Sequence, residues 1–313
     1  MNNFKILITD GLDERGQSIL RASAQVDEKK GLSEADLIDC VAGYDGLIIR
    51  GQTRVTAALL DAAARLKVVG RAGVGVDNID LEAAKKHTVA VVNAPTSTTV
   101  AVAELAMGLL LAVAREIPRA DASMKQGSWK RKEFEGVELN GKTLGVIGYG
   151  RIGTEVGRRA AAFGMNIVVY DPNVLEEELA HGDAEPVSLQ DLFAWSDFIS
   201  LHLPLNVQTR DLIGRSEISQ MRDGVRIIST ARGGIIDEAA LLEALNSGKV
   251  ACAALDVFGK EPPGLTELVS HPRLIATPHI GAQTSEAQSR AAEDIANEVL
   301  AALRGKPLRW RVA

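Results

Sequence analysis

Short runs of consecutive apolar residues recur along most of the chain and alternate with segments that carry a helical pattern. The runs are continuous and do not alternate with polar residues, which is typical of strands covered on both faces, as in parallel sheets. Strands that alternate with helices predict a doubly wound α/β architecture. The predicted strands are residues 5–9, 45–50, 67–72, 89–94, 143–148, 166–171, 198–203, 225–230, 251–257 and 274–279.

The length of 313 residues is enough for two domains. A long helical pattern from about 100 to 117 has no strand directly after it, and it leads into the charged stretch 120–140, which contains Trp129. We interpret the long helix as a crossing between domains and the charged stretch as an arm or loop. The last helical pattern, about 285–304, could return to the first domain.

Composition and charge argue against several classes of protein. The net charge is −6, from 35 basic and 41 acidic residues, so a nucleic-acid partner is not expected. The apolar stretch 105–114 is too short for a bilayer span, and the N-terminus lacks a signal-peptide pattern. Cys40 and Cys252 have no partner spacing, and no Cys–His cluster predicts a metal site. We therefore expect a cytoplasmic protein with neither a membrane nor a nucleic-acid partner.

The segment 148–153, GYGRIG, follows a predicted strand and opens an amphipathic helix, which is the context that a dinucleotide fingerprint requires. Gly148 permits the tight turn, Gly150 lets the backbone approach a pyrophosphate, and Gly153 lets the helix pack on the strand. The next strand ends in Asp171, whose carboxylate can accept both ribose hydroxyls and would repel a 2′-phosphate. The sequence therefore predicts NAD in preference to NADP; the alternative is a glycine-rich turn without a ligand.

Three later strands are followed by Arg232, Glu261 and His279, and open α/β sheets bind ligands outside such strand ends. A neutral histidine can accept the hydroxyl proton as the adjacent carbon loses hydride, and a carboxylate can orient its ring. An arginine can anchor a substrate carboxylate through its planar fork. Each residue alone also fits an ordinary structural role, but their joint placement favours hydride chemistry on a 2-hydroxy acid. The other histidines are interpreted as structural or exposed: His87, His181, His271 and His202, which could also line the cofactor cleft.

At these motifs the chain resembles the D-isomer-specific 2-hydroxyacid dehydrogenases, nearest to the phosphoglycerate-oxidising members. The resemblance implies a Rossmann-type NAD domain, residues 98–283 with a dimerisation arm at about 118–140, inserted in a flavodoxin-like substrate domain of residues 1–97 and 284–313. It also implies a homodimer or a dimer of dimers. The motifs that carry the resemblance are RAGVGVDNID (71–80), VNAP (92–95), VAELAMGLLLAVAR (102–115), GKTLGVIGYGRIG (141–153), VYDP (169–172), LHLPL (201–205), ARGGIIDE (231–238), ALDVFGKEPP (254–263) and TPHIGAQT (277–284).

The resemblance also implies roles for individual residues, beginning with Arg232, Glu261 and His279 as the catalytic arginine, glutamate and histidine. Leu203 and Val74 depart from the family pattern, which often has a small polar residue at the first position and Thr at the second. The implied cofactor contacts are Val74, Gly148, Gly150, Arg151, Ile152, Gly153, Asp171, Leu203, Thr230, Ala231, Arg232, Asp256, His279, Ile280, Gly281 and Ala282. The implied substrate contacts are Gly73 and Val74 in the loop 72–75, Arg232, His279 and, for a phosphate, Arg50 with Arg131 or Lys132.

The reaction implied by the resemblance is NAD-dependent oxidation of D-3-phosphoglycerate to 3-phosphohydroxypyruvate, the first step of serine biosynthesis, with His279 as general base. Two alternatives remain open within the family: a glyoxylate or hydroxypyruvate reductase, or another D-2-hydroxyacid dehydrogenase. An alternative from another class is an NAD-sensing scaffold of the corepressor type, which shares this fold and triad. Because little chain follows the last predicted helix, we expect no C-terminal regulatory domain and no serine feedback inhibition through one.

Overall fold

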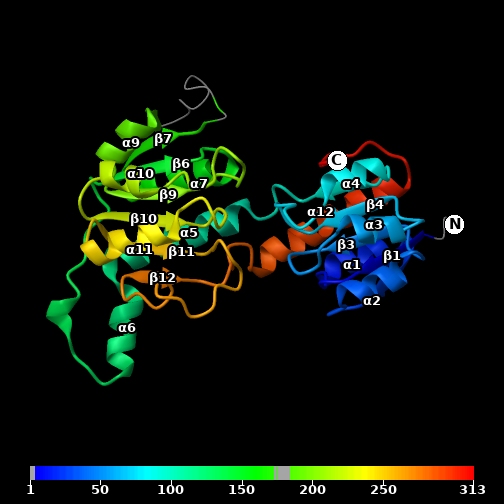
Figure 1. The fold of residues 1–313 in the computed structure, drawn as a ribbon, viewed down its shortest axis with the longest axis horizontal. Helices are drawn as coiled ribbons and strands as arrows, with labels where there is room; N and C mark the ends of the chain where they lie inside the picture. Colours follow the sequence, from blue (N-terminus) through cyan, green and yellow to red (C-terminus); the bar gives the residue numbers. More distant parts are fainter. Residues whose placement is uncertain (1–3, 173, 175–183) are drawn as a thin grey trace. The chain divides into compact units, whose positions relative to one another are not determined.

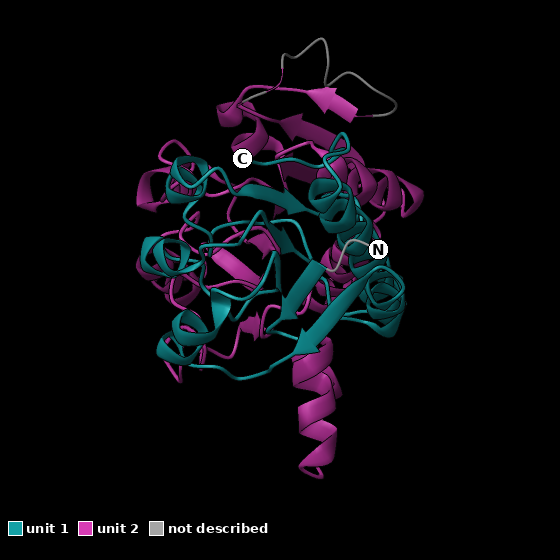
Figure 2. Ribbon diagram, turned by 90° about the vertical axis from the view of Figure 1, so that its right-hand side faces the viewer, with its two compact units in different colours: residues 1–99, 282–313 teal, residues 100–281 magenta. Residues whose placement is uncertain are grey.

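The computed structural model describes residues 4–172, 174 and 184–313, and the chain divides into two compact units (Figures 1 and 2). Unit 1 consists of Met1–Thr99 and Ala282–Ala313, and unit 2 of Val100–Gly281. The sequence predicted the boundaries at 97/98 and 283/284. Each unit contains its own parallel sheet with helices on both faces, so the predicted α/β class with two doubly wound sheets is confirmed.

Unit 1 contains a five-stranded sheet in the order β2-β1-β3-β4-β5, which is the flavodoxin-like order. Helices α1 (Glu14–Arg21) and α12 (Ser285–Leu303) pack on one face of the sheet. Helices α2 (Glu34–Val41), α3 (Ala57–Ala62) and α4 (Leu81–Lys86) pack on the other. The strands are β1 (Phe4–Ile8), β2 (Ala24–Glu28), β3 (Gly46–Ile49), β4 (Val68–Arg71) and β5 (Ala90–Asn93).

Helix α12 approaches the sheet of unit 1 very closely, which explains a glycine in the middle of a buried strand. A Cβ atom on Gly70 of β4 would lie 2.5 Å from Val299 Cγ2 and 2.9 Å from Ile295 Cγ1. The same helix meets α1 where a Cβ on Gly16 would lie 2.5 Å from the carbonyl oxygen of Ala292. The last helix of the chain is therefore part of the core of unit 1.

Unit 2 contains a seven-stranded parallel sheet in the order β12-β11-β10-β9-β6-β7-β8. The strand order reverses between β6 and β9, and open sheets of this kind bind ligands at that point. The strands are β6 (Thr143–Ile147), β7 (Asn166–Tyr170), β8 (Ala184–Pro186), β9 (Phe198–Leu201), β10 (Val225–Ser229), β11 (Val250–Leu255) and β12 (Leu274–Ala276).

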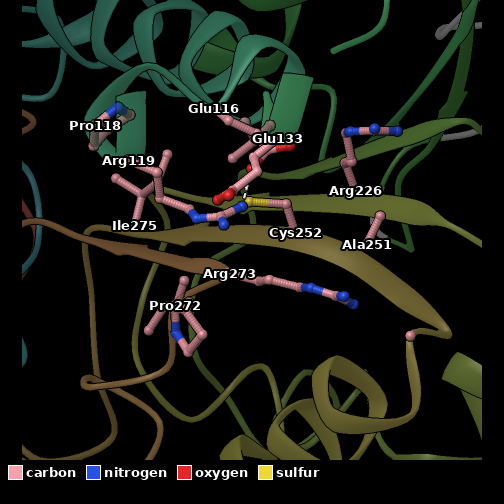
Figure 3. Close-up of a pocket in the computed structure, with 13 residues that line it drawn as sticks. Glu116, Pro118, Arg119, Glu133, Arg226, Ala251, Cys252, Pro272, Arg273 and Ile275 are labelled. Atoms are coloured by element: carbon pink, nitrogen blue, oxygen red, sulfur yellow. Dashed lines mark hydrogen bonds and ion pairs between the residues drawn. The ribbon is translucent and has the colours of Figure 1, made fainter. Parts of the chain in front are cut away.

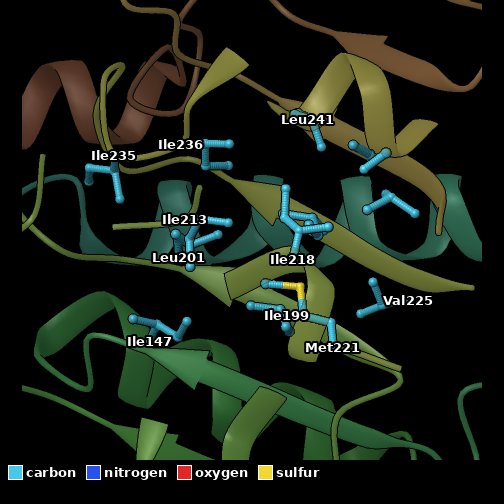
Figure 4. Close-up of a cluster of buried hydrophobic side chains, with 14 of the residues drawn as sticks. Ile147, Ile199, Leu201, Ile213, Ile218, Met221, Val225, Ile235, Ile236 and Leu241 are labelled. Carbon is cyan, nitrogen blue, oxygen red and sulfur yellow. The ribbon is translucent and has the colours of Figure 1, made fainter. Parts of the chain in front are cut away.

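Both faces of this sheet are covered by helices. Helices α9 (Leu189–Trp195), α10 (Arg215–Gln220) and α11 (Glu238–Ser247) bury a large apolar cluster, part of which is drawn in Figure 4. Helices α5 (Thr99–Arg115) and α7 (Arg151–Ala162) bury a second cluster on the opposite face. Coverage on both sides is the reason that the strands are continuous apolar runs in the sequence.

The predicted arm contains more helix than we expected. After α5 the backbone of Glu116 adopts the left-handed conformation, with φ 52°, and α6 (Ile117–Lys125) follows at once. In Figure 1 this helix projects away from the sheet of unit 2, and a short 3₁₀ helix, η1 (Arg131–Glu133), comes after it. No helix in the part of the chain that the structure describes is both long and apolar enough to cross a bilayer.

Candidate active site

The turn after β6 has the tight geometry expected of a dinucleotide fingerprint. Gly148 has a φ of 92°, and a Cβ atom there would lie 2.8 Å from the carbonyl carbon of His202. A Cβ atom on Gly153 would lie 2.1 Å from the carbonyl oxygen of Gly148. Neither position has room for a side chain, so both glycines are required for the turn and for the packing of α7 on it.

Gly150 is different, because its surroundings are open. It is the N-cap residue of α7, and a Cβ there would meet no described atom within 4 Å, its chain neighbours aside. The first N–H groups of a helix lack intrahelical acceptors, and the helix dipole favours an anion at this end. The open approach to the α7 N-terminus, at the β6–β9 switch point, therefore fits a pyrophosphate.

Two further features of unit 2 fit a nucleotide cofactor. Asp171, directly after β7, accepts a hydrogen bond from the backbone N–H of Tyr149 at 3.0 Å, so its carboxylate lies at the fingerprint turn. At the end of β10, the hydroxyls of Ser229 and Thr230 are buried without a hydrogen-bond partner among the described residues. Buried hydroxyls normally have partners, and a bound ligand can supply them. The side chain of Leu203, in contrast, is buried in the core cluster under α9–α11.

The predicted imidazole and carboxylate are in direct contact. His279 Nδ1 and Glu261 Oε2 are 2.8 Å apart, and Glu261 Oε1 accepts a hydrogen bond from the backbone N–H of Phe258 at 3.1 Å. Partial burial acts to raise the pKa of Glu261, but the hydrogen bonds from His279 and Phe258 and the charges of His279 and Arg232 lower it below its usual value. Glu261 is therefore ionised at neutral pH and can stabilise an imidazolium ion.

The backbone of His279 is held separately from its ring. His279 has a φ of 52°, in the left-handed region that costs a non-glycine residue about 1–2 kcal/mol. The buried carboxylate of Asp256 accepts hydrogen bonds from the hydroxyl of Thr277 at 2.6 Å and from the N–H groups of Ile280 and Gly281, each at 2.8 Å. Asp256 was predicted as a cofactor contact; in the structure both its oxygens hold the turn that presents His279.

Arg232 is part of the same group. The loop that carries it packs backbone to backbone on the loop that carries Glu261, because a Cβ on Gly233 would lie 1.8 Å from the carbonyl oxygen of Phe258. Arg232 Nη1 donates a hydrogen bond to the carbonyl oxygen of Ala231 at 2.7 Å. The carboxyl edge of the unit 2 sheet, at which the fingerprint turn also lies, therefore brings together a cation, a carboxylate and a half-exposed imidazole.

Several sequence-predicted residues lie instead at the carboxyl edge of the unit 1 sheet. Asp10, after β1, accepts hydrogen bonds from the N–H groups of Arg50 at 2.7 Å and Thr53 at 3.1 Å. Asn78 donates to the carbonyl oxygens of the same two residues, at 3.0 and 2.6 Å. Partial burial lowers the pKa of Arg50, against the opposing effect of the Asp10 charge. This network fixes the loop that bears Arg50.

Arg71 is a candidate binding residue that the sequence analysis missed. A Cβ on Gly73 would lie 1.5 Å from Arg71 Nη1, so the guanidinium occupies the space where a side chain of residue 73 would be. The adjacent loop is held by Asn93, whose side chain donates to the carbonyl oxygen of Val74 at 2.7 Å. The signal was present, since Arg71 is the polar last residue of a buried strand and begins the RAGVGVDNID motif.

Arg131 and Lys132 do not belong to the unit 1 edge. Both are exposed residues of η1 in unit 2. Their role as phosphate ligands therefore stays a prediction. Val74 and Ala282, predicted as cofactor contacts, belong to unit 1.

His202 is the remaining histidine with an unusual environment. Its Nε2 lies 2.8 Å from the hydroxyl of Ser200, and its Nδ1 is fully enclosed without a partner among the described residues. Burial of the ring lowers the pKa of His202 to about 3, so the ring is neutral in the folded protein. His87 contacts Asp61 and His271 accepts a hydrogen bond from the Arg273 backbone, whereas His181 lies outside the described residues.

A cavity of about 450 Å³ lies elsewhere in unit 2, near the start of α6 (Figure 3). It is lined by charged residues, among them Glu116, Arg119 and Arg273, and by the thiol of Cys252. Burial raises the pKa of Cys252 to about 11, so this thiol is not a nucleophile at neutral pH. None of the residues predicted for catalysis or cofactor binding is among those that line the cavity.

Comparison with known protein families places these features in context. Residues 107–281 match the model of the D-isomer specific 2-hydroxyacid dehydrogenase family, NAD binding domain. The chain is 50% identical over 305 residues to a D-3-phosphoglycerate dehydrogenase from Rattus norvegicus, covering 97% of this chain and 57% of the relative. It is 49% identical over 303 residues to one from Methanocaldococcus jannaschii, with coverage of 96% and 58%. The chain thus spans a little over half the length of these curated relatives.

Solved structures show the same similarity over whole chains. A glyoxylate reductase from Paecilomyes thermophila has a TM-score of 0.90 and 34% identity, covering 100% of this chain and 99% of its own. A D-lactate dehydrogenase from Aquifex aeolicus, complexed with NAD and lactic acid, has a TM-score of 0.83 and 31% identity, with 96% of both chains covered.

Proposed function

The chain belongs to the D-isomer specific 2-hydroxyacid dehydrogenase family and carries its NAD binding domain, and on this premise we propose that it oxidises D-3-phosphoglycerate to 3-phosphohydroxypyruvate. The observation that supports the reaction type best is the contact between His279 and Glu261, with the His279 backbone fixed by Asp256. The identity of about half to D-3-phosphoglycerate dehydrogenases over nearly all of this chain supports the substrate.

In this proposal His279 moves the proton. Its Nδ1 is engaged by Glu261, so Nε2 is the ring nitrogen that accepts the hydroxyl proton of the substrate. NAD, which the fingerprint turn and Asp171 would hold, would supply the acceptor for the hydride of C2. The ionised Glu261 stabilises the imidazolium that forms, because an opposite charge at hydrogen-bond distance favours the protonated ring. In the reverse direction His279 returns the proton to the carbonyl oxygen.

Arg232 would bind and orient the substrate. A guanidinium can bind a carboxylate with two parallel hydrogen bonds and can polarise the oxygen on C2. Its position beside the Glu261 loop supports this role, since the two loops share a backbone contact at Gly233 and Phe258. The phosphate would be bound by cations of unit 1, for which Arg50 and Arg71 at the sheet edge are the candidates.

A comparison of two keto acids tests the substrate. The rate constant kcat/KM with NADH is measured for 3-phosphohydroxypyruvate and for hydroxypyruvate. We expect the phosphorylated substrate to be better by more than about tenfold, which corresponds to roughly 1.4 kcal/mol of transition-state binding. A smaller difference would favour the glyoxylate or hydroxypyruvate reductase alternative, to which the solved glyoxylate reductase also points. Absence of turnover with any hydroxy or keto acid, together with NADH-dependent capture of a protein partner, would favour a corepressor-type scaffold.

We also propose that the chain forms a homodimer through unit 2 and the arm 118–140. Two large apolar side chains of the arm are exposed, Met124 by 54% and Trp129 by 78%, and a partner surface would bury them. Light scattering of the wild type and of Trp129→Ala tests this, with Val312→Ala, at an exposed apolar residue of unit 1, as the control. A wild-type monomer, or dimers unaffected by Trp129→Ala, would contradict the proposed interface. A cytoplasmic location remains a prediction.

A further inference from the structure

The loop that carries Glu261 needs a support of its own. Val257 and Phe258 are buried at the end of β11, but Gly259, Lys260 and Glu261 are exposed. This loop must hold a carboxylate within hydrogen-bond distance of an imidazole. A displacement of the loop by about 1 Å would lower the rate of the catalysed reaction. The hydrogen-bond partners of its backbone are therefore of functional interest.

Glu238 provides such a partner. Its Oε1 accepts a hydrogen bond from the backbone N–H of Gly259 at 2.6 Å, across 21 residues of sequence. Glu238 is in the first turn of α11, and the N-cap Asp237 accepts hydrogen bonds from the N–H groups of Ala239 and Ala240. A bond from an amide to a carboxylate is among the stronger hydrogen bonds in proteins. The acceptor is thus mounted on a capped helix.

The bond acts next to the contacts that place the catalytic pair. Phe258, the neighbour of Gly259, donates its N–H to Glu261 Oε1, and Glu261 Oε2 contacts His279. We infer that Glu238 is a positioning residue of the reaction: through Gly259 it holds the loop that presents Glu261 to His279. The inference rests on the proposed function.

This role explains why the ARGGIIDE motif extends from residue 231 to residue 238. The motif begins beside Arg232 and ends at Glu238. Its first part supplies the substrate-binding cation, and Gly233 packs on the Phe258 carbonyl. Its last residue tethers the same loop one residue further on. The motif therefore contacts both polar groups of the peptide bond between Phe258 and Gly259, in the loop that presents Glu261.

An ordinary interpretation of Glu238 is that an acidic residue in the first turn stabilises a helix through the dipole. Three substitutions separate the two roles. Glu238→Gln keeps the reach of the side chain and removes its charge; Glu238→Asp keeps the charge and falls short of Gly259; Glu238→Ala removes both. Glu243→Ala is the matched control, because Glu243 is an exposed acidic residue of the same helix paired with Arg215.

The substitutions are compared by steady-state kinetics and by NADH binding. Glu238→Ala and Glu238→Asp should lower kcat about tenfold, with KM for the hydroxy acid and the NADH dissociation constant changed less than about twofold. Glu238→Gln and Glu243→Ala should remain within about twofold of the wild type. Where the alanine variant does not fold, the aspartate variant supplies the same comparison. The inference is overturned if the aspartate variant matches the wild type, or if glutamine impairs kcat as much as alanine.

Amide hydrogen exchange at Gly259 tests the tether without reference to turnover. Protection of this amide should be lost in Glu238→Ala and Glu238→Asp and kept in Glu238→Gln. If the wild type turns over no hydroxy acid but the protection pattern holds, the proposed function is wrong and the tether stands. If turnover is normal but protection is unaffected by the substitutions, the tether is wrong and the proposed function stands.

Discussion

The two sheets end in edges of contrasting chemistry. In unit 2, the buried carboxylate of Asp256 holds the turn of His279, and the exposed carboxylate of Glu261 contacts its ring. In unit 1, Asp10 and Asn78 hold a loop that bears a cation, and a second guanidinium fills the space at Gly73. Both edges use side chains to fix backbone.

The contrast indicates that the two sheet edges serve different functions, although the units share the same architecture. Unit 2 has a titratable pair and an open helix N-terminus, which suit proton transfer and a dinucleotide. Unit 1 has guanidinium groups that stay charged at any physiological pH, which suit binding and not proton transfer. Substitutions of the His279–Glu261 pair should therefore change kcat, and substitutions of the unit 1 guanidinium groups should change KM.

The largest effect is expected for His279→Ala. Loss of the general acid/base should lower kcat by about 10²- to 10⁴-fold, while NADH binding stays nearly intact because the fingerprint turn is untouched. Steady-state kinetics and NADH fluorescence titration measure the two quantities, with His271→Ala as a control. Unchanged turnover would show that the chemistry does not lie at this edge.

Arg50→Ala should act on binding alone. Loss of a charged hydrogen bond costs about 1.5–3 kcal/mol, so kcat/KM for 3-phosphohydroxypyruvate should fall by about 10- to 100-fold, mainly through KM. The value for hydroxypyruvate, which has no phosphate, should change little. Arg54→Ala, which removes an exposed arginine of the same loop, is the control. An equal loss for both substrates would argue against a phosphate contact.

Asp171→Ala should relax the choice of cofactor. Without the carboxylate at the fingerprint turn, the repulsion of a 2′-phosphate is lost, and the ratio of kcat/KM with NADH to that with NADPH should fall by about tenfold. The exposed Glu185 of the edge strand β8 offers Glu185→Ala as a control. An unaltered ratio would place the ribose away from Asp171.

The smallest effect concerns stability. Because the folded protein holds the pKa of His202 at about 3, the unfolded chain binds more protons below pH 7, so stability falls as pH falls. With an unfolded pKa near 6.5, this contribution drops by about 0.8 kcal/mol from pH 7.5 to pH 6.0. Urea unfolding at both pH values should show this extra loss in wild type and in His87→Gln, but not in His202→Gln. The same loss in all three would assign it elsewhere.

Much of the fold was predictable because buried parallel strands appear as apolar runs. Helix starts also follow from residue type: Ser188 and Asp237, whose side chains are common N-caps, accept backbone hydrogen bonds at the starts of α9 and α11. Strands β2 and β8 were missed. They lie at the edges of their sheets, and β2 has no fully buried residue, so its sequence AQVDE carries no apolar run.

The candidate site could be predicted only for residues whose side chains, in their sequence motif, indicate a particular chemical role. The glycines of the fingerprint and the pair His279 and Glu261 could be singled out in this way. The supporting contacts could not, because Asp256 and Glu238 act on turns about 20 residues away, and only the folded backbone brings them there. Arg71 could have been predicted from the sequence, because it is the polar last residue of a buried strand, but its position in the space beside Gly73 depends on the folded backbone.

Because unit 1 is formed by two separate segments of the chain, it can complete its fold only after the second segment has been synthesised. Helix α12, which covers Gly70 and one face of the unit 1 sheet, leaves the ribosome only after the whole of unit 2. A nascent chain therefore holds part of an apolar sheet face, the part that α1 does not cover, unprotected while the inserted unit is completed, and it must then close a loop of about 180 residues. Chaperone dependence during synthesis should consequently fall on the N-terminal third of this protein.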